Sequence, residues 1–336
     1  MTAEELAALW RDLGDEMTGP SPIIRRRVLP DAAIDLFVCV LRPEGRVGLQ
    51  IEMDGDRKIP RSRLPTCKGL KISSNGLRGT RSRQSVIIQL DNAALRDVFS
   101  VLAADLLETV MREATAQAGL DRCLDRLSMW QGLLEQLPDA GLGPPAQRGL
   151  IGELVVLQSL HLEVLDPVMA ITAWNGPGRA YQDFTTVGVA VEVKTSLGKR
   201  HAQLRITSEK QLDETPFTDL FLAHVGLVES VSGLSLAAHV AAVRERLAGS
   251  HAALTEFNLR LLTAGYLDSH QEAYREPSYA IERLDFYRVD GEFPRLTGTM
   301  LSPGVGDVTY TIIADDLSRF GVSAEDVAIT VGAAHG

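Results

Sequence analysis

The chain has 336 residues and a formal net charge of −10 at pH 7, with 45% hydrophobic and 23% charged residues. This length allows one large domain or two of ordinary size, and the composition is that of a folded protein. No stretch is long and apolar enough to cross a bilayer, and the N-terminus lacks the features of a secretory signal. Three cysteines without CxxC spacing argue against a zinc site and indicate a reducing compartment, so we expect a cytoplasmic protein.

The first part of the chain is predicted to combine strands with helices. Residues 1–17 have the pattern of a short amphipathic helix. Four short apolar or alternating runs predict strands: IIRRRVL, IDLFVCVLR, RVGLQIEM and SVIIQL. Residues 92–136 have apolar side chains at helical spacing, and the Pro- and Gly-rich stretch 138–145 is the best internal boundary. We therefore expect a β-rich and helical N-terminal domain over residues 1–137.

A basic stretch lies within this predicted domain. No Asp or Glu occurs from Arg57 to Leu90, whereas nine cations do. They are Arg57, Lys58, Arg61, Arg63, Lys68, Lys71, Arg78, Arg81 and Arg83. A solvated, loop-rich face is one interpretation, and a surface that binds nucleic-acid phosphates is the other. The overall acidity does not exclude nucleic acid, because phosphate contacts depend on the local charge.

The second part of the chain, over residues 146–336, has a different order of elements. Residues 147–165 predict one long helix, followed by short strands near 169–174, 183–187, 189–195 and 204–207. A short helix is expected at 208–214, a strand at 219–228 and helices within 236–264. The tail predicts strands around 280–289 and 308–313 and a small helix near 315–320.

A predicted hairpin in this part carries the residues of chemical interest. It turns near Gly188, and on its second strand Glu192 and Lys194 point to one face because side chains alternate. A Glu-x-Lys triplet alone is typical of a solvated strand face. Asp183, on the first strand of the hairpin, can place a second carboxylate beside Glu192. Two adjacent carboxylates repel unless a cation lies between them, and a hard ion such as Mg²⁺ with oxygen ligands suits them. Lys194 could stabilise charge on a phosphate or help to activate a water.

The spacing Asp183, eight residues, Glu192, one residue, Lys194 resembles the core motif of the PD-(D/E)XK phosphodiesterase superfamily, which includes many restriction endonucleases. Glu153, on the helix before the strands, matches the acidic residue that this superfamily often places there. By the same resemblance Gln211 faces the site, and the backbone carbonyl of Val193 joins Asp183, Glu192 and Glu153 as a metal ligand. Gln182 stands where the motif has proline, which weakens the match.

The resemblance covers residues 147–228 and implies an α/β (α+β) restriction-endonuclease-like core, a mixed sheet flanked by helices, within a domain over 146–336. The chain as a whole, including YRVDGEFP at 287–294 and GDVTY at 306–310, resembles a bacterial group placed in the same superfamily, whose genes are associated with phage-defence and restriction-modification clusters. It implies a role in antiviral defence, with a homodimer and ATPase or methyltransferase subunits as partners.

We expect a Mg²⁺- or Mn²⁺-dependent endonuclease that hydrolyses DNA, with catalytic residues Asp183, Glu192, Lys194, Glu153 and Gln211. RNA stays open as a substrate, since no RNA-specific or stacking-aromatic motif is visible. A second cluster of cations, Lys199, Arg200 and Arg205, follows the Glu-x-Lys strand and would contact the nucleic-acid backbone at the rim of the site. The alternative function is a catalytically silent subunit that binds DNA or assembles a defence complex. Retention of all the acids with the lysine argues against it, because buried like charges cost stability without a metal.

Overall fold

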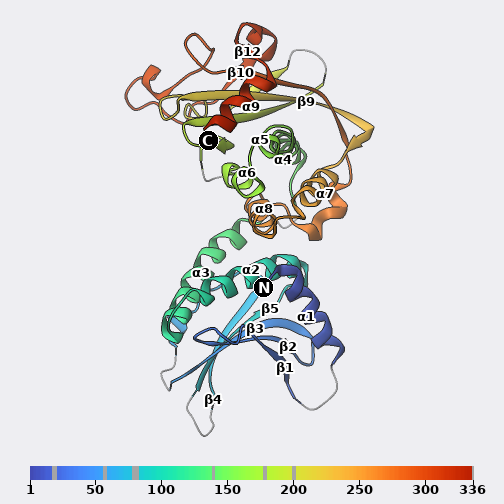
Figure 1. Cartoon of the computed structure of the whole chain (residues 1–336), viewed down its shortest axis with the longest axis vertical. Helices are drawn as coiled ribbons and strands as arrows, with labels where there is room; N and C mark the ends of the chain where they lie inside the picture. Colours follow the sequence, from blue (N-terminus) through green and yellow to red (C-terminus); the bar gives the residue numbers. More distant parts are fainter. Residues whose placement is uncertain are drawn as a thin grey trace. The chain divides into compact units, whose positions relative to one another are not determined.

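A computed structural model describes residues 1–16, 21–55, 59–77, 83–137, 141–176, 180–198 and 202–334. The chain divides into two compact units, Met1–Asp139 with Leu267–Ser269, and Ala140–Tyr266 with His270–Gly336. Within the part of the chain that the structure describes, no helix is long and apolar enough to cross a membrane. The fold is mixed α/β, as expected, with sheets flanked by helices (Figure 1).

The first unit is an antiparallel sheet with helices on one of its faces (Figure 1). Its strands follow the order β1-β2-β3-β5-β4, with bounds β1 (Ile23–Val28), β2 (Asp35–Leu41), β3 (Arg46–Asp54), β4 (Leu70–Leu77) and β5 (Arg83–Leu90). The four predicted strands correspond to β1, β2, β3 and β5, whereas β4 escaped prediction. Alternate residues of neighbouring strands, such as Val38, Leu49 and Ile88, are buried in register and form the core face.

Three helices cover that core face: α1 (Ala3–Asp15), α2 (Arg96–Met111) and α3 (Ala116–Gln136). Helix α1 begins with a capping box, in which Thr2 and Glu5 each accept a hydrogen bond from the other's backbone N–H. The indole Nε1 of Trp10 donates to the carbonyl of Gly48 at 3.1 Å and ties α1 to the sheet. Short 3₁₀ turns lie at Arg61–Arg63 and Ala93–Leu95.

The second unit contains a mixed five-stranded sheet in the order β12-β10-β9-β7-β6. The bounds are β6 (Phe184–Thr185), β7 (Val189–Leu197), β9 (Asp219–Leu234), β10 (Tyr279–Arg288) and β12 (Gly321–Val322). Strands β7 and β9 are parallel, and the remaining pairs are antiparallel. A two-stranded sheet pairs β8 (Gln203–Ile206) with β11 (Tyr310–Ile313).

Helices of this unit gather against one face of the larger sheet (Figure 1). They are α4 (Pro144–Val156), α5 (Leu162–Val164), α6 (Pro167–Ala173), α7 (Leu236–Leu247), α8 (His251–Thr263) and α9 (Ala324–Ala333). A π-helical turn, Leu157–His161, joins α4 to α5, so the long helix predicted over 147–165 is continuous but locally widened. Further 3₁₀ turns are Asp268–Tyr274, Gly298–Met300 and Ala314–Phe320.

Two sequence-based predictions for this unit were wrong. Residues 169–173 form most of helix α6 rather than a strand, because Asp166 caps its first turn and Pro167 occupies the first helical position. Trp174 follows the helix and forms an isolated bridge with Phe184. Residues 208–214 form turns rather than a helix. A second core covers the opposite face of the larger sheet, and it includes Leu204, Leu212 and Tyr287.

Candidate active site

Strand β7 separates apolar from catalytic side chains by simple alternation. Val191 and Val193 belong to the core beneath the helices, whereas Ala190 belongs to the second core on the other face. Glu192 and Lys194 share the face of Ala190. That face is not solvated as a plain amphipathic strand would be, because the second core covers it. The Glu192 side chain is 0% exposed and that of Lys194 14% exposed.

Asp183 lies one residue before β6, at the edge of the sheet. The antiparallel register pairs Phe184 with Val191, so one further step sets Asp183 opposite Glu192. Its Oδ2 accepts a hydrogen bond from the N–H of Val193 at 2.7 Å. The N–H and C=O of one strand residue point to the same side. The Val193 carbonyl therefore points toward the edge on which Asp183 lies.

Glu153 approaches from helix α4, which packs closely on β7. The close approach depends on Gly152, where a Cβ would lie 2.3 Å from Cγ2 of Thr195. The carboxylate of Glu153 accepts a hydrogen bond from Nε1 of Trp174 at 2.7 Å. This donor was not predicted, since no sequence signal links an indole at the end of α6 to a carboxylate 21 residues earlier.

Lys194 and Glu192 form a buried hydrogen-bonded pair. The ammonium Nζ donates to Oε1 of Glu192, while Oε2 of Glu192 is buried and has no hydrogen-bond partner among the described residues. A buried carboxylate oxygen without a partner is costly, and a bound cation would satisfy it. A bound cation would therefore contact Oε2 of Glu192 first among the atoms of this site.

The pKa values of the four groups reflect this crowding. Burial and the neighbouring Asp183 raise the pKa of Glu192 to about 8. Burial, Asp183 and Glu192 hold the pKa of Glu153 well above its usual range, against the hydrogen bond from Trp174. Burial also raises the pKa of Asp183, although Lys194 and the Val193 N–H oppose it. Burial lowers the pKa of Lys194, but the carboxylates outweigh burial and leave it above its ordinary value.

This charge distribution suits a divalent cation. Asp183 and Glu192 raise the pKa of Glu153, and Asp183 raises the pKa of Glu192, so a positive charge placed among them would favour the ionised carboxylates. The described ranges hold no group of three or more His, Cys, Asp or Glu side chains placed to bind a metal ion together. Mg²⁺ does not require one, because it is held by one or two carboxylates together with waters and substrate phosphates. The residues present therefore fit an open Mg²⁺ or Mn²⁺ site.

Gln182 and Gln211 both belong to the wall beside Asp183. Gln182 is buried, and its Nε2 donates to the carbonyls of Lys210 and Gln211 at 2.8 and 3.2 Å. The residue in the usual proline position thus anchors the turn at 208–214. The Oε1 of Gln211 accepts from the N–H of Thr207 at 2.8 Å, so this oxygen is engaged within the turn. A catalytic role for Gln211 stays a prediction.

A histidine and a serine extend the polar face beyond Lys194. In the β7–β9 register His224 lies beside Lys194, and its Nε2 is 2.7 Å from Oγ of Ser196. His224 is 0% exposed, and burial lowers its pKa. Neither residue belongs to a sequence motif. The signal that could have found His224 is a lone polar residue within the apolar run of β9, Asp219–Leu234.

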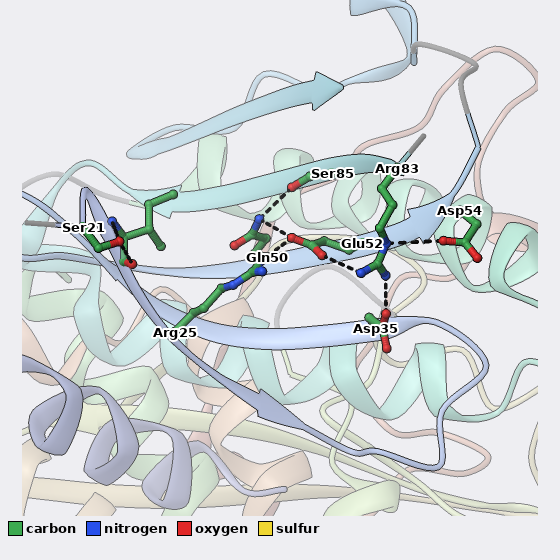
Figure 2. Close-up of polar contacts among 9 residues, drawn as sticks. Ser21, Arg25, Asp35, Gln50, Glu52, Asp54, Arg83 and Ser85 are labelled. Carbon is green, nitrogen blue, oxygen red and sulfur yellow. Dashed lines mark hydrogen bonds and ion pairs between the residues drawn. The ribbon is translucent and has the colours of Figure 1, made fainter. Parts of the chain in front are cut away.

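Acids neutralise part of the predicted basic stretch in the described residues. Arg63 pairs with Asp121 at 2.8 Å, and Nζ of Lys68 donates to the carbonyl of Leu137 at 3.1 Å. Arg83 pairs with three acids, Asp35, Glu52 and Asp54, which lie on neighbouring strands (Figure 2). The exposed members are Arg61, Arg63, Lys71 and, in the second unit, Arg205. Six further predicted cations lie outside the described residues: Arg57, Lys58, Arg78, Arg81, Lys199 and Arg200.

Comparison with known proteins gives a family match but no close relative. No curated protein and no solved structure matches the chain. One family matches over residues 6–315, which is nearly the whole length, and its description is "Putative PD-(D/E)XK family member, (DUF4420)". The match spans both units and includes Glu153, Asp183, Glu192 and Lys194. The chain therefore belongs to this family of PD-(D/E)XK, nuclease-like proteins.

Proposed function

We propose that this protein is a metal-dependent endonuclease that hydrolyses phosphodiester bonds in DNA. The observation that carries the proposal is the buried set of three carboxyl groups and one ammonium, with Oε2 of Glu192 lacking a partner in the described residues. Without a bound metal ion, such a set costs stability through desolvation and repulsion. The family match supports a nuclease-like activity, and DNA as the substrate is our further step.

Asp183 and Glu192 would hold Mg²⁺ or Mn²⁺ directly, with the Val193 carbonyl on the same edge. Glu153 would act directly or through a water. The chemistry supplied by the ion at such a site is neutralisation of phosphate charge and activation of a water. Trp174 orients Glu153 through its N–H, and the Val193 N–H orients Asp183, so both carboxylates are preorganised by groups that carry no charge.

Lys194 is the positively charged side chain of the proposed site. Its pKa lies above the ordinary value, so the side chain is an ammonium at neutral pH and cannot accept a proton there. It would donate hydrogen bonds to the phosphate or to the attacking water. Its hydrogen bond to Glu192 holds the ammonium on the catalytic face of β7.

The test is cleavage of supercoiled plasmid with Mg²⁺ or Mn²⁺, and with EDTA as the metal-free arm. Asp183→Asn and Lys194→Met should each abolish metal-dependent nicking. Glu325→Gln removes an exposed carboxylate of α9 outside the site and serves as the matched control. Cleavage that persists in both site variants would refute the assignment. DNA binding without cleavage under either metal would instead favour the silent binding or assembly subunit.

The biological setting of the proposal rests on resemblance alone. We propose a role in restriction or antiviral defence, with a homodimer or with ATPase or methyltransferase partners. RNA of the same sequence, assayed beside the plasmid-derived DNA, decides between the two nucleic acids.

A further inference from the structure

An open pocket of about 370 Å³ lies at the end of β7 that follows the catalytic residues. Its walls include Arg148 from α4, Thr195 and Ser196 from β7, and Gln203 from β8. Pro144 and Pro145 occupy the start of α4 and have no N–H to offer, so a ligand would be recognised by side chains rather than by the helix end.

Arg148 gives the pocket a positive charge. Its side chain is partly exposed and forms no ion pair with a carboxylate in the part of the chain that the structure describes. Other arginines of this unit, such as Arg246 and Arg288, do pair with acids. The guanidinium of Arg148 therefore keeps its donors for an anionic ligand, and phosphate matches its fork geometry.

Ser196 adds a donor whose direction follows from His224. The Nδ1 of His224 is buried and has no partner among the described residues, whereas Nε2 meets Oγ of Ser196 at 2.7 Å. An orphaned buried N–H is rarer than an orphaned acceptor, so the proton of the neutral ring belongs on Nε2. The imidazole then donates to Oγ. The hydroxyl proton of Ser196 is consequently free to point to an acceptor in the pocket.

The pocket lies close to the proposed catalytic centre along both β7 and α4. Ser196 follows Lys194 by two strand residues, about 7 Å along β7. Arg148 precedes Glu153 by five helical residues, about 7.5 Å along α4. A nucleic-acid strand with its scissile phosphate at Glu192 and Lys194 would place a neighbouring phosphate at a comparable distance.

We propose that Arg148 and Ser196 form a subsite that binds a phosphate next to the scissile one, with His224 as the positioning residue of Ser196. This inference rests on the proposed nuclease function. It makes Arg148 a substrate-binding residue.

The test measures binding rather than cleavage. Fluorescence anisotropy of a labelled duplex DNA, with EDTA present, gives the dissociation constant over a range of salt concentrations. Arg148→Gln should weaken binding for every sequence. It should also make the negative slope of log association constant against log salt shallower by about 0.9, the value for one lost phosphate contact. Arg275→Gln removes the same charge from an exposed residue that pairs with Glu272, and should leave the slope unchanged.

Variants of Ser196 and His224 test the orientation of the serine hydroxyl without changing the charge of Arg148. Ser196→Ala should weaken binding severalfold without changing the salt slope. His224→Phe should reproduce that loss, whereas His224→Gln, whose amide can donate from a similar position, should restore most of the affinity. RNA of the same sequence is run in parallel, because recognition of the phosphate predicts the same slope change for both nucleic acids.

The outcomes distinguish the two proposals. A folded Arg148→Gln variant with the wild-type slope, together with full affinity in Ser196→Ala, overturns the subsite and leaves the nuclease proposal intact. Wild-type protein that neither binds nor cleaves DNA or RNA overturns both. If Arg148→Gln fails to fold, the comparison of Ser196→Ala with the two His224 variants decides the matter alone.

Discussion

Replacing Gly152 by alanine tests the packing that brings helix α4 to the catalytic strand. An added Cβ would lie 2.3 Å from Cγ2 of Thr195, so the helix or Thr195 would have to move. Such over-packing costs about 1–3 kcal/mol. The gain in helix propensity from Gly to Ala offsets about 0.8–1 kcal/mol of that cost. We therefore expect Gly152→Ala to change the free energy of unfolding by between about 0 and −2 kcal/mol.

Gly149→Ala is the matched control, because a Cβ there meets nothing within 4 Å on the same helix. It should gain the propensity term alone, about 0.8–1 kcal/mol. The difference in unfolding free energy between the two variants then isolates the steric cost, about 1–3 kcal/mol. Each kcal/mol corresponds to about 2–4 °C in Tm for a unit of this size. Calorimetric unfolding measures both.

A rescue completes the cycle. Thr195→Ser removes the methyl group that the new Cβ would meet, so Gly152→Ala in that background should behave like Gly149→Ala. Equal stabilities of Gly152→Ala and Gly149→Ala in the wild-type background would refute the close approach, and with it our explanation of how Glu153 reaches the site.

Three further predictions concern buried polar groups. Glu52 is 1% exposed and pairs with two arginines (Figure 2), so Glu52→Gln should lower the free energy of unfolding by about 1–3 kcal/mol in urea. Asp54 is exposed, and Asp54→Asn should change it by no more than about 0.5 kcal/mol. Because the pKa of Glu192 rises from 4.5 to about 8, the metal-free native state keeps a proton that the unfolded chain releases. Stability should thus fall as pH rises from 4.5 to about 8, and a Tm series in which Glu192→Gln falls just as steeply would contradict this. Trp174→Phe removes the donor to Glu153 and should weaken Mn²⁺ binding by about 10–100-fold in a calorimetric titration, while unchanged affinity would remove Trp174 from the site.

Local patterns were sufficient for much of the second unit. Alternation in residues 189–195 predicted β7, and the short sequence distance between Asp183 and Glu192 predicted their approach across a hairpin. Antiparallel neighbours in a tight hairpin are set by the turn, so their register can be inferred from the chain itself. The helix at 169–173 was missed because its apolar run was given more weight than the Asp–Pro signal at its start.

The basic stretch shows that acids distant in the sequence can lie beside its cations. No acid lies within it along the chain, yet Asp35, Glu52 and Asp121 reach Arg83 and Arg63 from other elements. Pairing of strands and helices brings these opposite charges together over long sequence distances. Charge along a segment is therefore a poor guide to charge on a surface.

The sequence alone determined which residues of β7 share a face, because the two-residue period of a strand is a local property. Only the tertiary structure decided that this face is buried. The second core covers Glu192, Trp174 reaches Glu153 from α6, and His224 comes beside Lys194 from a parallel strand. Burial is what raises the pKa values of the carboxyl groups, and it depends on segments that pack from elsewhere in the chain.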